Sequence, residues 1–168
     1  MEILKYDNSN LTNARIFVSF LKNDRISYYW TIEVGNDVNT FICLDFLEIE
    51  GIYLPAQLER KIVIQNREEE LILHTIIIDN SGNKVFSSMS IEFLLFDSVK
   101  QEFKLNFLLK KLDLEVSFNG IVSFSGFFLH NFDKQSAIFF SKKLDISGNL
   151  KELLNKDNRR LYYHLSQL

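Results

Sequence analysis

The sequence predicts a mainly β protein, either an antiparallel β-sandwich or a closed barrel, of about nine or ten strands with a C-terminal α-helix. Short runs in which apolar and polar residues alternate follow one another along the chain, and turn-forming residues bound each run. Phe occurs 16 times and aromatic residues make up 14% of the chain, whereas Ala, the best helix former, occurs only as Ala14, Ala56 and Ala137. The single proline and six glycines form no linker, so one domain over residues 1–168 is expected.

The N-terminal part predicts three consecutive strands. Alternation is clearest over residues 25–34, which we expect to form a half-buried strand. Residues 14–21 precede it across the turn sequence KNDR and are its expected hairpin partner. Residues 41–49 form the expected third strand, and Pro55 is expected at a sheet edge or in the following loop.

The middle of the chain continues with strand patterns. Residues 71–78 are apolar on both faces apart from His74 and Thr75, which is typical of a strand that is covered on both sides. The turn sequence DNSGN follows it and leads into the alternating run 85–95, so these two runs are expected to form a second hairpin. Further alternation over 103–107 predicts another strand.

Asn119-Gly120 lies between two alternating runs, which is a strong signal for a β-hairpin. A two-residue loop at this point would place Val116 opposite Ser123, and partners across a ladder share one face of the sheet. A three-residue loop over 118–120 instead pairs Val116 with Val122, so that apolar residues oppose apolar residues. We therefore predict a bulged hairpin with Gly120 in the left-handed conformation.

The pattern changes near the C-terminus. Residues 135–143 are expected to form the last strand. After them, Asn149 resembles a helix N-cap with Glu152 three residues later. Leucines then recur at helical spacing, so a helix is predicted over 149–166.

Composition and charge exclude several classes of function. The formal net charge is -3, which argues against a protein that coats nucleic acid or an anionic membrane. Cys43 is the only cysteine, so an internal disulfide and a multi-cysteine metal site are excluded and a reducing compartment is favoured. The N-terminus lacks the pattern of a secretory signal and the apolar stretches are too short to span a bilayer. We expect a cytoplasmic protein.

The sequence contains no catalytic or cofactor signature. The three histidines are not at metal-ligand spacing, no Gly-rich loop precedes a helix, and the motif G-x-S-x-G is absent. Asp113 and Glu115 alternate onto one face of a strand, where a solvated surface explains them as well as acid–base chemistry does. Arg159 and Arg160 precede two tyrosines, but cations also suit the end of a helix. We expect a non-enzymatic protein with no cofactor, no metal and no nucleic-acid partner.

Two features suit a protein partner. Three consecutive carboxylates at 68–70 and the pair Asp113 and Glu115 can attract a basic surface, although a charge run is more often a solvated turn. Tyr29 and Phe127 also fall on the polar sides of their strands, as interface anchors do, although a covering helix or loop would explain them equally well. The candidate partner-binding residues are Glu68, Glu69, Glu70, Asp113, Glu115, Tyr29 and Phe127.

In general character, as an acidic β domain rich in Phe and Asn, the chain resembles the immunity proteins that bacteria make against polymorphic or contact-dependent toxins. The resemblance implies a cytoplasmic inhibitor that blocks the active site of a cognate toxin, commonly a basic nuclease, with carboxylates in place of phosphates. The alternative is a β-barrel carrier or enzyme whose Phe-rich inner face lines a cavity for a small apolar ligand.

Overall fold

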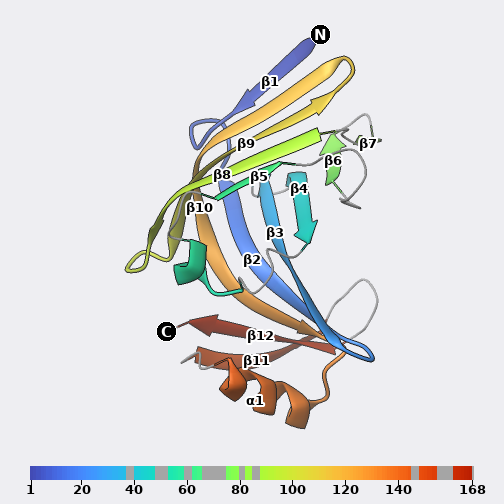
Figure 1. Ribbon diagram of the computed structural model, residues 1–168, viewed down its shortest axis with the longest axis vertical. Helices are drawn as coiled ribbons and strands as arrows, with labels where there is room; N and C mark the ends of the chain where they lie inside the picture. Colours follow the sequence, from blue (N-terminus) through green and yellow to red (C-terminus); the bar gives the residue numbers. More distant parts are fainter. Residues whose placement is uncertain are drawn as a thin grey trace.

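The computed structural model describes residues 1–36, 40–47, 53–58, 62–65, 75–79, 82–84, 88–144, 148–154 and 161–167. The protein is mainly β, and its described strands belong to one strongly curved sheet (Figure 1). The elements, in chain order, are β1 (Glu2–Tyr6), β2 (Asn13–Lys22), β3 (Ile26–Gly35), β4 (Thr40–Leu47), the 3-10 helix η1 (Pro55–Leu58), β5 (Ile62–Gln65), β6 (Thr75–Asp79), β7 (Gly82–Lys84), β8 (Ser88–Asp97), β9 (Glu102–Lys111), β10 (Leu114–His130), α1 (Lys134–Lys143), β11 (Gly148–Leu154) and β12 (Leu161–Gln167).

The main path of the sheet runs in the order β5-β8-β9-β10-β2-β3-β4-β6-β7. β1 and β12 add to β10, and β11 adds to β12. β10 pairs in parallel with both β1 and β2, so the expectation of a purely antiparallel fold is wrong. Among the described strands, β5 and β7 end the path without pairing with each other, so the sheet is open and the closed barrel, the alternative to the preferred sandwich, does not form. The described strands belong to one sheet, so the predicted sandwich of two sheets is not confirmed either.

β10 is the central strand of the fold. Along one edge it pairs first with β1, over 114–118, and then with β2, over 123–130. Along the other edge it pairs first with β9, over 114–123, and then with β12, over 127–130. Each edge of β10 therefore has one junction where a partner strand ends and the next begins.

The concave face of the sheet forms the core. The rings of Trp30 on β3 and Phe103 on β9 contact each other with centroids 6.3 Å apart, although β10 and β2 lie between these strands in the sheet. The sheet therefore curves until side chains of non-adjacent strands meet. At its lower end in Figure 1, α1 packs on the core through Phe140, whose ring lies 5.0 Å from that of Phe20. The largest fully buried side chains are Trp30, Phe93, Phe103, Phe107, Phe118, Phe127, Ile16, Ile32, Ile42, Leu44 and Leu58.

The first predicted hairpin is confirmed. β2 and β3 pair antiparallel from Asn13 with Gly35 to Lys22 with Ile26. β4 then pairs with β3 as the expected third strand, and Pro55 lies buried in η1. The second predicted hairpin, between residues 71–78 and 85–95, does not form among the described residues. β6 pairs with β7, whereas β8 pairs with β5 and β9.

The predicted hairpin at Asn119-Gly120 is wrong. β10 passes through these residues as one continuous strand, and the chain reverses at Leu112-Asp113, where Lys111 pairs with Leu114. The alternation of inward and outward side chains cannot distinguish a bulged hairpin from an unbroken strand here. A three-residue loop and an unbroken strand both keep Val116 and Val122 on one face.

Gly120 serves a close approach rather than a turn. The Asn8 side chain fills the junction between β1 and β2, because its Oδ1 accepts the Ile121 N–H at 2.6 Å and its Nδ2 donates to the Ile121 carbonyl at 2.8 Å. A Cβ atom at Gly120 would collide with Asn8 Oδ1 and lie 2.9 Å from Phe118 Cζ. The Asn8 amide thus replaces a missing strand peptide, and Gly120 leaves room for it.

The two C-terminal predictions are also wrong. Residues 135–143 lie in helix α1, whose N-cap Asp133 accepts the Ser136 N–H at 2.9 Å. The Ser136 hydroxyl and then its N–H hold the pKa of Asp133 well below its usual value, and the nearby Lys22 ammonium adds to this. The described parts of the predicted helix 149–166 are instead strands β11 and β12, which pair antiparallel, and β12 also pairs with the free edge of β10 next to the core.

Replacing the Asn8 amide tests its role as a substitute peptide. We expect Asn8→Ala to lower the free energy of unfolding, measured by urea denaturation, by about 1–2 kcal/mol, because two backbone groups of Ile121 lose their partner. Gly120→Ala is expected to destabilise the protein by about 1–3 kcal/mol by overpacking. The double variant should lose less stability than the sum of the two single losses, because the main collision of the new Cβ atom is with Asn8.

The matched control is Asn149→Ala, at an exposed position on β11, which should change stability by no more than about 0.5 kcal/mol. Fully additive losses in the Asn8 and Gly120 variants would contradict the proposed contact.

Candidate functional site

A β-bulge on β10 determines which side chains reach the outer face of the sheet. The register with β2 shifts between Phe124 and Phe127. Gly126 within the bulge has φ +88°, and a Cβ atom there would lie 2.5 Å from the Leu165 carbonyl oxygen. Glycine is required at this position because the backbone is left-handed and β12 approaches closely.

The bulge overturns the prediction that Phe127 is an exposed aromatic residue. Phe127 is fully buried, at 0% exposure, and its ring contacts those of Phe20 and Phe124 in the core. The expectation assumed that alternation continues from Ser123 and Ser125, whereas the bulge changes the parity. Phe127 therefore does not belong to a partner-binding surface, and Phe128 occupies the outer position.

Phe128 is the centre of a row of rings that crosses β2, β10 and β12. Its ring centroid lies 4.9 Å from Phe17, 4.7 Å from His164 and 5.9 Å from Tyr162. His130 stacks on Tyr162 with centroids 5.8 Å apart. All five side chains are half-buried. We call Phe17, Phe128, His130, Tyr162 and His164 the outer aromatic stripe.

Polar residues extend the outer aromatic stripe towards β3. The Arg15 guanidinium lies 5.2 Å from the Phe17 ring centroid and forms an ion pair of 2.6 Å with Glu33. Tyr29 shares the outer face of β3 with Glu33 and is half-buried. Tyr29 thus lies on the predicted side of its strand, next to the outer aromatic stripe.

The two histidines of the stripe differ in their surroundings. Burial lowers the pKa of His130, so its imidazole is neutral at pH 7. His164 Nε2 lies 2.5 Å from the Ser125 carbonyl oxygen. A carbonyl only accepts, so His164 donates to it through Nε2–H.

A hollow of about 350 Å³ lies beside His164, at the junction between β9 and β12 on β10. At this junction the Phe124 N–H donates to the Gln101 carbonyl at 2.7 Å. The Gln101 side chain donates through Nε2 to the Ser98 carbonyl at 2.6 Å, whereas its Oε1 is buried without a hydrogen-bond partner. We call this space the His164 hollow; it is lined by Gln101, Phe124, Ser125, Gly126, His164 and Ser166.

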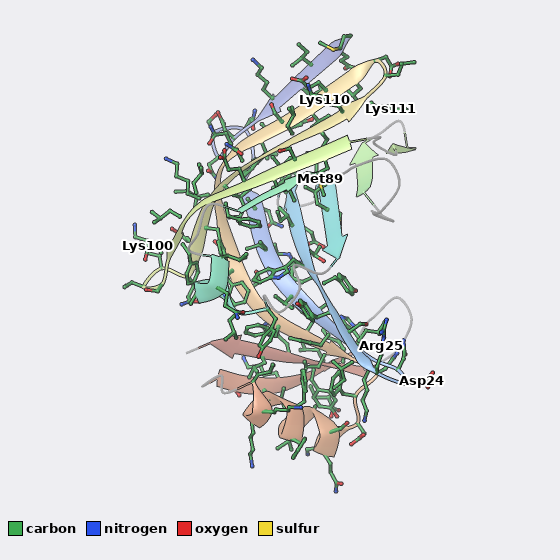
Figure 2. The ribbon with its side chains drawn as sticks, in the orientation of Figure 1. Asp24, Arg25, Met89, Lys100, Lys110 and Lys111 are labelled. Atoms are coloured by element: carbon green, nitrogen blue, oxygen red, sulfur yellow. The ribbon has the colours of Figure 1, made fainter. Side chains whose placement is uncertain are left out.

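The predicted acidic residues do not form one acidic cluster in the described part of the chain. Glu68, Glu69 and Glu70 lie outside the described residues. Asp113 is exposed in the β9–β10 turn, and Glu115 is half-buried and lies 3.4 Å from the Lys110 ammonium. Figure 2 shows Lys110 and Lys111 together at the end of β9, so lysines accompany these two carboxylates. Ser123 and Ser125 are not their neighbours, contrary to the predicted hairpin register.

Within the described ranges, no group of three His, Cys, Asp or Glu side chains is arranged to hold a metal ion. None of the helices in the described ranges is both long enough and apolar enough to cross a membrane. Cys43 is half-buried on β4 and reduced, opposite Glu33 and Ile76.

Sequence reasoning missed most of the outer aromatic stripe. Phe17 falls on the outer side of the correctly predicted strand 14–21, so alternation alone could have identified it. Tyr162 and His164 were assigned to a helix, and Phe128 changes side only through the bulge. No local pattern marks those three positions.

No protein-family model matches the chain, and comparisons with curated proteins and with solved structures gave no significant match.

Acidification is expected to destabilise the protein through His130. The folded-state pKa of His130 lies below the usual 6.5, so the unfolded chain binds a proton first and stability falls as the pH drops below about 6.5. His130→Phe keeps a ring beside Tyr162 but removes the titrating group. Urea denaturation between about pH 5 and pH 7 should show a shallower loss of stability in this variant. Equal pH dependence in both proteins would contradict this role of His130.

Proposed function

We propose that this chain is a non-enzymatic binding module and that the outer aromatic stripe is the centre of its interface with a protein partner. The observation that carries the proposal is the row of half-buried rings around Phe128, with the Arg15 guanidinium at one end. Aromatic residues and Arg are enriched in the central parts of protein interfaces, where few side chains supply most of the affinity.

The support of the stripe favours this use. Phe17, Phe128 and Tyr162 stand on three neighbouring strands whose backbones are fixed by pairing with β10. Ser19 is the register partner of Phe128 on β10 and of Tyr29 on β3, and it is only 2% exposed, so the outer face is closely packed at this point. A surface that is already ordered loses little conformational entropy when a partner binds.

Within this class, we propose a cytoplasmic immunity protein that binds and blocks a cognate bacterial toxin. Inhibition by occlusion requires only a complementary surface on the inhibitor, which suits a stripe on a rigid sheet. Asp113 and Glu115 lie at the opposite end of β10 from Phe128, and we propose that they form an acidic rim that speeds association with a basic toxin domain. Glu68, Glu69 and Glu70 are proposed as further carboxylates for the same role.

The structure does not favour the alternative of a β-barrel carrier for an apolar ligand. The described strands leave the sheet open, and its concave face is filled by fully buried side chains such as Trp30, Phe103 and Phe107. A carrier of that kind needs a closed wall and an empty interior.

The experiment that tests the proposal is co-expression with the toxin domain encoded beside the gene of this protein. We expect restored growth of the host and a stable complex on size-exclusion chromatography. A neighbouring toxin that stays active and unbound in the presence of the folded protein would overturn the immunity function.

Truncation of the stripe tests the interface. We expect Tyr162→Ala and Phe17→Ala each to weaken the complex about thirty-fold in calorimetric titration, as loss of an interface hot spot does. The matched control is Phe139→Ala on α1, which is 72% exposed and lies outside the stripe, and which should leave affinity unchanged. Circular dichroism must show that each variant is folded. Loss of affinity in the control alone would place the interface on α1 instead.

The rim can be tested separately by charge reversal. Glu115→Lys together with Asp113→Lys should slow association about ten-fold at low salt, with a smaller effect at high salt, because rim charges act mainly on the association rate. Surface plasmon resonance at two salt concentrations measures this. Unchanged association at low salt would remove Asp113 and Glu115 from the rim.

A further inference from the structure

The His164 hollow exists because of how strands meet along one edge of β10. β9 pairs with β10 as far as Ser123, and β12 begins to pair at Phe127. Between these points the bulge turns the backbone, and Gly126 allows β12 to approach without closing the gap. Five of the six lining residues therefore belong to strands β10 and β12, and Gln101 comes from the β8–β9 turn.

The exposed lining of the hollow is more apolar than polar, and none of its six residues is Asp, Glu, Lys or Arg. Gln101 contributes an amide, Ser125 and Ser166 contribute hydroxyls, and His164 contributes an imidazole. The Phe124 ring supplies an apolar wall. Hydroxyl, amide and imidazole groups can each donate or accept hydrogen bonds, so this set suits a neutral ligand with several hydroxyl groups.

Gln101 indicates that a donor is needed. Its Oε1 is buried and has no hydrogen-bond partner, a state that is disfavoured in folded proteins. Its Nε2 donates to the Ser98 carbonyl at 2.6 Å. The terminal torsion of Gln is broad, so the amide can pivot on this bond and offer the oxygen to a hydroxyl in the hollow.

We infer that the His164 hollow is a binding site for a neutral, polyhydroxylated small molecule of about monosaccharide size. A volume of about 350 Å³ is at the lower end of the range for small-molecule sites. One ligand hydroxyl donates to Gln101 Oε1, others bond to Ser166 and to the His164 ring, and the C–H face of the ligand packs on Phe124. The inference does not rest on the proposed protein partner, although His164 belongs to both the hollow and the outer aromatic stripe.

Saturation-transfer NMR and calorimetric titration with methyl α-glucoside, methyl α-galactoside and N-acetylglucosamine test the inference, without any partner present. We expect at least one of these probes to bind saturably at a single site. Gln101→Leu and Ser166→Ala should each weaken binding about ten-fold, because each removes a hydrogen-bonding group from the lining. The matched control Gln135→Leu, at an exposed position on α1, should leave affinity unchanged.

Inorganic phosphate and arginine methyl ester serve as charged probes. Binding of either in place of the glycosides would overturn the inference of a neutral ligand. Failure of all three neutral probes to bind, or binding that survives both Gln101→Leu and Ser166→Ala, would overturn the site itself. If Gln101→Leu does not fold, the affinity of folded Ser166→Ala, compared with that of Gln135→Leu, decides whether the hollow is the binding site.

Discussion

The pairing of both edges of β10 is the constraint on which the rest of the structure depends. A buried strand must satisfy its backbone N–H and C=O groups on both sides, and no single neighbour of β10 spans its whole length. Each edge is shared by two strands, which creates two junctions. The Asn8 amide closes the junction between β1 and β2, whereas the junction between β9 and β12 stays open as the His164 hollow. One backbone requirement thus explains both a structural asparagine and a candidate site.

The bulge at Gly126 gives the two halves of β10 different relations to the core. Before it, Val116, Phe118 and Val122 face inward; after it, Phe127 and Leu129 do so. Without the change of parity, the second half would direct Phe128 inward and lose its match with the core residues of β2. The same change builds the outer aromatic stripe. Core packing and the exposed rings are therefore two results of one backbone irregularity.

The outer face and the hollow share His164 but differ in chemistry. The stripe is a broad row of rings with Arg15 at its end, which suits a protein surface. The hollow is small and concave, and it combines an apolar wall with a few hydroxyl and amide groups, which suits a compact neutral molecule that has both hydroxyl groups and a C–H face. Because the His164 ring contacts that of Phe128 and also donates to the Ser125 carbonyl, a ligand in the hollow would contact a residue of the stripe.

The sequence by itself determined the β character of the chain, the β2–β3 hairpin and the outward position of Tyr29, because side-chain alternation is a local property of a strand. It could not show that β10 runs through Asn119-Gly120, since a bulged hairpin and a straight strand place the same residues inward. The leucines of 149–166 fit a helix as well as a hairpin, and only the free edge of β10 selected the hairpin. Phe128, Tyr162 and His164 came together through contacts between distant parts of the chain. Alternation specifies which residues are buried, but tertiary structure alone decides which strands meet, because backbone hydrogen bonds between strands carry no sequence code.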